Sequence, residues 1–347
     1  MYSLGIDIGY SAIKAVVLES GKVVIHAEYA LHKGDVAGTA RSLVERVLNL
    51  PCAGEIRHGA VTGSGSAFLS DSGSMRRVNE VAAMVEGALL IDGECVSVVE
   101  MGGQTAKFIT GFSRHDKANV EVSMTSTCSS GTGSFLEEQV SRLGMKIEDY
   151  SAQAAKSTFV PRIAGRCSVF AKTDITHHQQ EGVPIPDILA GLAHAVVKNY
   201  RSAVMRGLPR NAPMLFAGGV CHNAAITNAM RSVLKLGPQE LRTHEHSGVA
   251  GAIGAAVLAS QDALPVDLET VPPALADVSS RNIHVLEDLR LKPLAGLGEN
   301  DGEAKHIVRE LPEQAPMDCW LGIDVGSTST NLALVDGQDN IVGYRYL

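Results

Sequence analysis

The amino-acid sequence predicts a mixed α/β fold with two lobes that share one plan. Its 347 residues are 45% apolar, which is enough to bury a sizeable core in two lobes. Residues 4–30 have the pattern of three short strands joined by tight turns, and the same rhythm restarts at residues 95–110. Helical spacing of apolar residues follows the first group of strands, so the first lobe combines helices with strands.

Composition and charge exclude several classes of protein. There are 30 Lys and Arg residues against 38 Asp and Glu residues, and the formal net charge of −8 favours neither nucleic acid nor an anionic membrane as a partner. No apolar run approaches the roughly 20 residues that span a bilayer, and the first residues lack the pattern of a signal peptide. We therefore expect a cytoplasmic protein. Its 6 cysteines are too widely scattered to predict a disulfide framework.

We assign residues 1–94 and 247–261 to the first lobe. Its strands are expected in "SLGIDIG", "AIKAVVLE" and "GKVVIHAEYAL", and short turns between them imply antiparallel neighbours. In "VAGTARSLVERVLNL", Leu43, Val47 and Leu50 have the spacing of one helix face. The segment "SGVAGAIGAAVLAS" places Gly248, Gly251 and Ala255 on one face, where another backbone could approach closely.

Residues 95–246 are assigned to the second lobe. It begins with "CVSVVEMGGQTAKFI", an apolar strand that reaches a carboxylate, two glycines and another strand. The segment "SFLEEQVSRLG" is predicted as a helix with Ser134 and Glu137 as its capping box. Farther along, "PMLFAGGVCHNAAITNAMRSVLK" has the pattern of a strand, a Gly-Gly turn and a helix.

The last part of the chain repeats its beginning. Residues 262–319 are rich in Pro, Asp, Glu and Gly without sustained periodicity, and we predict a linker there. After them, "LGIDVGSTSTNLALV" closely matches the opening "LGIDIGYSAIKAVV". We interpret residues 320–347 as the truncated start of a second, similar unit. Strands without the rest of their sheet should be poorly packed or borrowed by a neighbour.

The turn after the first strand carries residues suited to phosphate. Asp7, Gly9, Ser11 and Lys14 would combine backbone N–H groups, a hydroxyl and an ammonium on an anion, and Asp7 would hold Mg²⁺ through water. An ordinary β-hairpin explains the same residues, because Asp-x-Gly turns are common. The independent "VVEMGGQTAK" favours the phosphate site, since two related turns facing one cleft would hold a phosphate from both sides.

Two cysteines differ from the rest in their neighbours. Cys128 lies in the small-residue loop "STCSSGTGSF" before a predicted helix, and Cys167 lies beside Arg166. Free N–H groups or positive charge at these places would stabilise thiolates, although the spacing alone does not establish a shared metal. The other cysteines are expected to be inert: Cys52, Cys95, Cys221 and Cys319.

Two further patterns are weak signals. The segment "FAGGV" at residues 216–220 could seat a nucleoside against bare backbone, and a plain tight turn explains it equally well. Two histidine pairs could suggest zinc, but they lack a partner set at the usual ligand spacing. We expect these histidines in surface loops: His177, His178, His244 and His246.

Five motifs, taken in order, resemble the ATPase activators of 2-hydroxyacyl-CoA dehydratases and the related ATPase subunits of benzoyl-CoA reductase. They are "GIDIGYSAIKAVV", "EMGGQTAK", "CSSGTGSFLE", "RCSVFAKTD" and "FAGGVCHN", within about residues 3–260. The resemblance implies a ribonuclease H-like fold of the actin, sugar-kinase and heat-shock-chaperone ATPases, with ATP or ADP between two lobes. Long members of the family carry two such units in tandem.

The resemblance also implies an iron-sulfur activator. A 4Fe-4S cluster at a homodimer interface would pass a low-potential electron from a donor to an acyl-CoA dehydratase or reductase component. Cys128 and Cys167 match the cluster ligands, Asp7 and Glu100 would hold Mg²⁺ through water, and Glu100 and Gln104 would serve hydrolysis. The implied nucleotide-binding residues are Asp7, Gly9, Ser11, Lys14, Gly102, Gly103, Gly131, Gly133, Gly218 and Gly219.

Three residues depart from the family pattern. Tyr10 stands where a small or hydroxyl residue is usual, Glu100 replaces an Asp, and Thr105 replaces the Asp of "GGQD". These changes predict a less open first turn, shifted Mg²⁺ contacts and weakened hydrolysis.

Two other functions remain open from the residues. A sugar or amino-sugar kinase would use the same fold with a carboxylate base and would have no need of Cys128 and Cys167. A non-catalytic nucleotide-sensing module would bind ATP without turnover, which Tyr10 and Thr105 would suit.

Overall fold

The chain divides into two units, residues 1–281 and residues 282–347. None of the described helices combines the length and the apolar character needed to cross a bilayer. The structure is a computed structural model that describes residues 1–70, 74–125, 131–165, 167–280, 318–325, 330–338 and 340–346.

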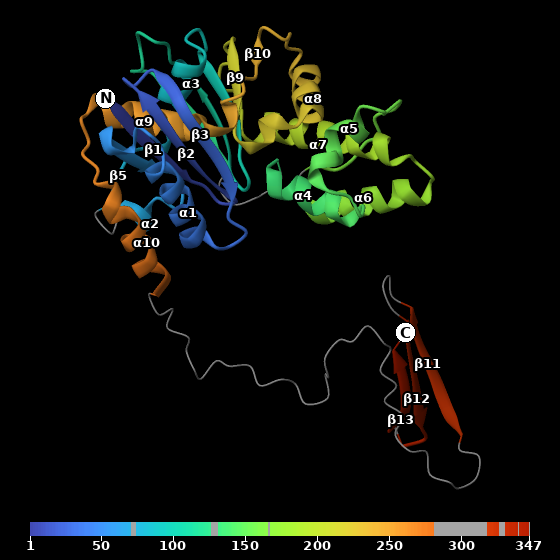
Figure 1. The fold of residues 1–347 in the computed structure, drawn as a ribbon. Coiled ribbons are helices and arrows are strands. Elements are labelled where there is room, and N and C mark those ends of the chain that lie inside the picture. Colours follow the sequence, from blue (N-terminus) through green and yellow to red (C-terminus); the bar gives the residue numbers. More distant parts are fainter. Residues whose placement is uncertain are drawn as a thin grey trace. The chain divides into compact units, whose positions relative to one another are not determined.

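The first sheet of unit 1 contains the predicted opening hairpins. Strands β1 and β2 are antiparallel, as are β2 and β3, while β4 runs parallel to β1 and β5 parallel to β4 (Figure 1). The strand order is therefore β3-β2-β1-β4-β5. The bounds are β1 Tyr2–Ile8, β2 Ala12–Glu19, β3 Val23–Leu31, β4 Ile56–Thr62 and β5 Arg76–Arg77.

The second sheet has the same topology as the first. Its order is β10-β9-β6-β7-β8, with antiparallel pairs β6/β7 and β7/β8 and parallel pairs β6/β9 and β9/β10. The expected repetition of the first strand pattern in the second lobe is thus confirmed. The bounds are β6 Ser97–Met101, β7 Ala106–Thr110, β8 Glu121–Met124, β9 Met214–Ala217 and β10 Leu241–Arg242.

Helices connect and cover the two sheets (Figure 1). The described α-helices are α1 Val36–Leu48, α2 Ala67–Ser70, α3 Glu80–Ile91, α4 Gly133–Arg142, α5 Tyr150–Ala154, α6 Ser168–Gln180, α7 Ile185–Ala203, α8 Ala224–Leu234, α9 Ala250–Gln261 and α10 Val271–Ser280. Short 3-10 helices are η1 Ala53–Glu55, η2 Ile147–Asp149, η3 Gly219–His222, η4 Ser247–Val249 and η5 Leu268–Thr270.

Both faces of the first sheet are buried by helices. On β2, Ile13 and Val17 pack in one cluster with residues of α1 and α10, whereas Val16 and Leu18 pack in another cluster with α9. The second sheet is covered in the same way, with α3 on one face and α4, α7 and α8 on the other. Burial on both faces explains why the central strands read as nearly continuous apolar runs.

The helices α3 and α9 pack against each other at very close range. A Cβ atom at Gly254 of α9 would clash with the Ala83 carbonyl oxygen of α3, and one at Gly87 would clash with the Ala250 carbonyl oxygen. Only glycine allows this approach at either position. The backbone approach predicted for "SGVAGAIGAAVLAS" therefore exists, but at Gly254 and not on the predicted face of Gly248, Gly251 and Ala255. Gly248 and Gly251 lie nearest the side chains of His222 and Asp7 instead. Since α3 covers the second sheet and α9 the first, their crossing sets how the two sheets face each other.

The predicted linker begins too early. Residues 262–280 include η5 and α10, and Leu268, Val271 and Leu275 are buried in the core beneath the first sheet. The prolines of "TVPPALA" suggested a linker, but they occupy the first turn of α10, where a missing backbone N–H costs nothing. The remainder of the predicted linker, from residue 281 to residue 317, lies outside the described residues.

Unit 2 contains a three-stranded antiparallel sheet, β11-β12-β13. Its hairpin pairs Asp324 with Asn331, and Trp320, Leu321 and Ile323 are each more than half exposed. This exposure is expected of strands that no described helix covers. The bounds are β11 Cys319–Val325, β12 Thr330–Asp336 and β13 Ile341–Tyr346.

Candidate active site

Each sheet of unit 1 begins with a hairpin of the same construction. Asp7 of β1 lies directly opposite Lys14 of β2, and Glu100 of β6 lies directly opposite Lys107 of β7. Both turns are closed by the same backbone bond. The Gly9 N–H donates to the Ala12 carbonyl at 3.0 Å, and the Gly102 N–H donates to the Thr105 carbonyl at 2.9 Å. The two turns are therefore structural equivalents.

The two turns face each other across one cavity. Asp7, Gly9, Ser11 and Lys14 line it from the first sheet, and Glu100, Gly102, Gly103 and Gln104 line it from the second. The turns touch, because a Cβ atom at Gly103 would clash with the Ser11 hydroxyl. We call this space the phosphate cavity. It is also lined by Gly218, Gly219, Thr62, Glu80 and Tyr10.

Four backbone N–H groups at the tips of the turns have no acceptor among the described residues. Within the described residues, the N–H groups of Tyr10, Ser11, Gly103 and Gln104 donate to no carbonyl or side chain. Successive unpaired N–H groups in a turn form a concave surface that binds anions. Two such turns, one from each sheet, converge on the same cavity.

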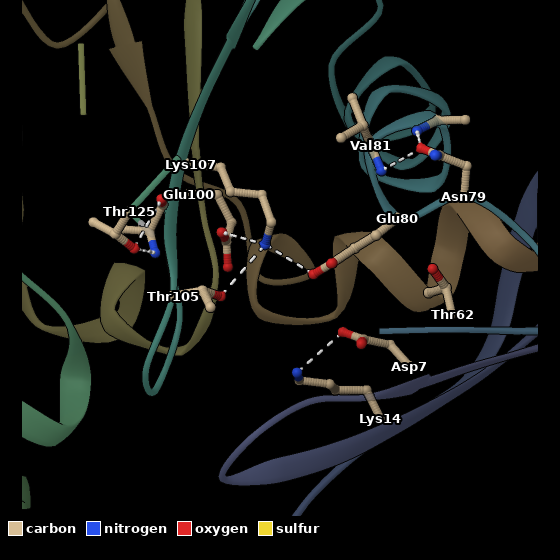
Figure 2. A network of polar contacts seen from close by, with 12 residues as sticks. Asp7, Lys14, Thr62, Asn79, Glu80, Val81, Glu100, Thr105, Lys107 and Thr125 are labelled. Carbon is tan, nitrogen blue, oxygen red and sulfur yellow. Dashed lines mark hydrogen bonds and ion pairs between the residues drawn. The ribbon is translucent and has the colours of Figure 1, made fainter. Parts of the chain in front are cut away.

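Lys14 and Asp7 form an ion pair on the first side of this cavity (Figure 2). The Lys14 ammonium lies 3.0 Å from Asp7 Oδ2, and both side chains are 14% exposed. Burial opposes the ammonium charge, but the Asp7 carboxylate outweighs it and raises the pKa of Lys14. The lysine is therefore positively charged at neutral pH and lines a cavity that suits an anion.

A second ion-paired lysine lies on the other side. Figure 2 shows the Lys107 ammonium between two carboxylates, 3.1 Å from Glu100 Oε2 and 2.8 Å from Glu80 Oε1, with Thr105 Oγ1 at 3.5 Å. Burial disfavours its charge, yet the two carboxylates raise the pKa of Lys107. Burial raises the pKa of Glu100, an effect that Lys107 opposes and Glu80 reinforces. Unlike Lys14, Lys107 is only 3% exposed and does not line the cavity.

A second cavity of about 310 Å³ adjoins the first. It is lined by residues of η3 and of α4. These are Gly219, Val220 and His222 of η3, Asn223 directly after it, and Gly133, Leu136 and Glu137 of α4. The start of α4 is bonded to the second turn, because the Gly133 N–H donates to the Gly102 carbonyl at 2.9 Å and the Ser134 N–H to the Gly103 carbonyl at 2.8 Å. We call this space the nucleoside cavity.

The pattern of the BadF/BadG/BcrA/BcrD ATPase family matches residues 4–259. The chain belongs to this family. The 2-hydroxyisocaproyl-CoA dehydratase activator of Clostridioides difficile is 29% identical to it over 265 residues, which cover 76% of this chain and 96% of the relative.

Two solved structures of related proteins confirm the predicted α/β fold with two lobes. Component A of Acidaminococcus fermentans (R)-2-hydroxyglutaryl-CoA dehydratase superposes with a TM-score of 0.68 at 27% identity, over 76% of this chain and 99% of that chain. The activator of 2-hydroxyisocaproyl-CoA dehydratase from Clostridium difficile, with bound ADPNP, superposes with a TM-score of 0.65 at 25% identity. The match covers 82% of this chain and 99% of that chain.

Most of the residues expected from the family resemblance meet in the two cavities. Asp7, Glu100 and Gln104 line the phosphate cavity, and Gly133 lines the nucleoside cavity. Gly131 lines neither. Four more of the expected residues line both cavities: Ser11, Gly102, Gly103 and Gly219. Three others line the phosphate cavity: Gly9, Lys14 and Gly218.

The two expected cluster ligands cannot be compared in space. Cys128 lies outside the described residues. Cys167 is half-buried at the N-terminus of α6, next to Val169 and Phe170, which are each 65% exposed. Among the described residues, no group of three or more His, Cys, Asp or Glu side chains is arranged to hold a metal ion.

Sequence reasoning missed Glu80 and Lys107. Asn79 caps α3 by accepting N–H bonds from Val81 and Ala82, and this cap places Glu80, the first helical residue, at the cavity (Figure 2). The motif "NE" before an apolar run marks a helix start, but it does not indicate a position in the cleft. Lys107 had a clear signal, because it follows Glu100 at the same spacing as Lys14 follows Asp7.

Two local predictions were wrong. Ser134 does not cap α4, which begins at Gly133, because carbonyl groups of the second turn already accept the first N–H groups of this helix. His177 and His178 lie in α6 rather than in a loop, and His178 Nε2 lies 3.0 Å from the Arg162 carbonyl oxygen.

Proposed function

We propose that the protein binds Mg-ATP between its two lobes, hydrolyses it and thereby activates an acyl-CoA dehydratase-type or benzoyl-CoA reductase-type partner by electron transfer. One observation carries the nucleotide part of this proposal. Two equivalent turns with unpaired N–H groups face each other in a cavity that also contains Lys14, Asp7 and Glu100. Phosphate oxygens and a hydrated Mg²⁺ are the ligands that such an arrangement suits.

The two cavities together suit a nucleoside triphosphate. The phosphates would lie between the turns, where Lys14 and the free N–H groups supply positive charge. The adenosine would occupy the nucleoside cavity of about 310 Å³, where Glu137 can accept bonds from ribose hydroxyls. The relative from Clostridium difficile whose structure contains ADPNP supports nucleotide binding by this fold.

Gln104 is proposed to orient the attacking water. It lies at the tip of the second turn and lines the phosphate cavity together with Glu100. Asp7 and Glu100 would hold Mg²⁺ through water, because both carboxylates line the cavity.

The Gln104→Ala variant tests this role. We expect kcat for ATP hydrolysis to fall about 10- to 100-fold while the Kd for ADP stays within about twofold, because a misplaced water affects the transition state more than ground-state binding. Gln261→Ala, at the exposed end of α9, is the matched control and should change neither quantity. Unchanged hydrolysis in Gln104→Ala would reassign the role, and ADP binding by the wild type without any ATP turnover would indicate a nucleotide sensor instead.

Cys167 supports the electron-transfer part of the proposal. It is half-buried at the N-terminus of a helix of 13 residues, and it is a free cysteine. With Cys128 it would supply two of four cysteine ligands to a 4Fe-4S cluster, completed by the same pair of a second subunit. When bound, such a cluster supplies one-electron transfer at low potential.

The hydrogen bonds between the second turn and the start of α4 offer a route from the nucleotide to the segment that contains Cys128. Gly133 and Ser134 are held by carbonyl groups of the second phosphate turn, so a shift of that turn displaces α4. The segment that contains Cys128 immediately precedes α4 in sequence. We propose that hydrolysis alters the cluster environment through this helix, in a cytoplasmic homodimer that receives its electron from a low-potential donor.

A further inference from the structure

The phosphate cavity and the nucleoside cavity share a narrow boundary. A molecule that fills both must pass the residues that line both, and these present mainly backbone or small side chains. Tyr29 of β3 is the exception, since it is the one large side chain among them. The shared residues are Ser11, Tyr29, Gly102, Gly103 and Gly219.

Tyr29 belongs to a row of three side chains across the first sheet. Asp7 lies opposite Lys14, and Lys14 lies opposite Tyr29. The Lys14 ammonium is 3.0 Å from Asp7 Oδ2 and 5.7 Å from the centre of the Tyr29 ring. A carboxylate and the face of an aromatic ring therefore hold this ammonium from two sides, which limits the directions that it can take.

Tyr29 also reaches the other lobe. A Cβ atom built on Gly219 would lie 2.7 Å from the Tyr29 hydroxyl oxygen, so the hydroxyl rests against the turn before α8. Tyr29 is 44% exposed, and its partial burial raises the pKa of its hydroxyl, which is protonated and able to donate a hydrogen bond at neutral pH. One side chain thus connects the edge strand of the first sheet with the Gly218–Gly219 turn of the second lobe.

On the basis of the proposed nucleotide binding, we infer that Tyr29 binds the diphosphate of the nucleotide where it passes from one cavity to the other. The hydroxyl donates to a phosphate oxygen, and the ring keeps the Lys14 ammonium directed at the same group. The residues beside Tyr29 at this boundary favour a phosphate there over a ribose or a base. Ser11 and Gly103, which line it with Tyr29, contribute unpaired backbone N–H groups.

The Tyr29→Phe variant separates this contact from general packing, because it removes only the hydroxyl. We expect the Kd for ADP to rise about tenfold, the effect of losing one hydrogen bond to a charged group, while the Kd for adenosine stays the same. For ATP hydrolysis, KM should rise by a similar factor with kcat nearly unchanged, since the contact exists both before and during the reaction. Isothermal titration with ADP and adenosine measures the first two quantities.

Val23→Ala is the matched control, because Val23 is an exposed side chain of the same edge strand and lines neither cavity. It should leave both Kd values unchanged. Equal Kd values for ADP in wild type and Tyr29→Phe would overturn the inference while leaving nucleotide binding intact. An equal loss for adenosine and ADP would also overturn it, since the hydroxyl would then contact the nucleoside. A wild-type protein that binds no ADP would instead remove the proposed function itself.

Discussion

Replacing Lys107 with Met is expected to lower the free energy of unfolding by about 3–5 kcal/mol. The Lys107 side chain is 3% exposed and its single positive charge pairs with both Glu100 and Glu80, so its removal leaves the buried Glu100 carboxylate without its ion-pair partner. Methionine keeps much of the volume of the lysine stem, which limits any cavity effect. Chemical unfolding at neutral pH measures the loss.

The dependence of this loss on pH has a definite sign. Burial already raises the pKa of Glu100 in the folded wild type, and losing Lys107 removes the charge that opposes the increase. A carboxyl group whose folded pKa lies above its unfolded value costs stability as pH rises through that interval. The deficit of Lys107→Met should therefore be smaller at about pH 4.5 than at about pH 8.

Two companion variants make this prediction specific. Lys107→Met combined with Glu100→Gln should regain part of the lost stability, because a neutral amide needs no counter-charge. Lys117→Met removes a lysine that is paired with Glu86 but is 39% exposed, and it should cost less than about 1 kcal/mol. Equal losses in Lys107→Met and Lys117→Met, or a deficit independent of pH, would contradict a buried ion-pair network at the second turn.

Anaerobically purified protein is expected to contain about four irons per dimer, and Cys167→Ala should lose essentially all of them together with dimerisation. A cubane cluster needs four thiolates, and in the proposed homodimer two subunits would supply two each. Removing one ligand from each subunit would leave only two ligands at the interface. Iron and sulfide analysis with size measurement in solution tests both effects.

Cys319→Ala provides the control for this experiment, because Cys319 is an exposed cysteine of unit 2. Its iron content should equal that of the wild type. Unchanged iron in Cys167→Ala would exclude this residue as a ligand, whatever its effect on ATP hydrolysis.

Local patterns predicted the sheets well because they depend on neighbouring residues. The opening hairpins follow from alternating apolar strands and short turns, and their repetition in the second lobe follows from the same pattern around Glu100. The contact between Asp7 and Lys14 also follows once the register of one hairpin is known.

The missed residues depend on packing between distant segments. Glu80 reaches Lys107 because α3 is held tightly on α9 through Gly87 and Gly254, and nothing near Glu80 in sequence records that crossing. Tyr29 belongs to an edge strand whose side chains alternate in exposure, which is typical of a solvent-facing strand. Its approach to Gly219 arises only when the two lobes come together.

The central claim is that one nucleotide is held by both phosphate turns at once. Amide hydrogen exchange of the wild-type protein, with and without Mg-ADP, tests it directly, because the four unpaired N–H groups would then acquire phosphate acceptors. We expect the peptide containing Tyr10 and Ser11 and the peptide containing Gly103 and Gln104 both to become protected at the same ADP concentration. Binding of ADP with either peptide exchanging as fast as in the free protein would contradict it.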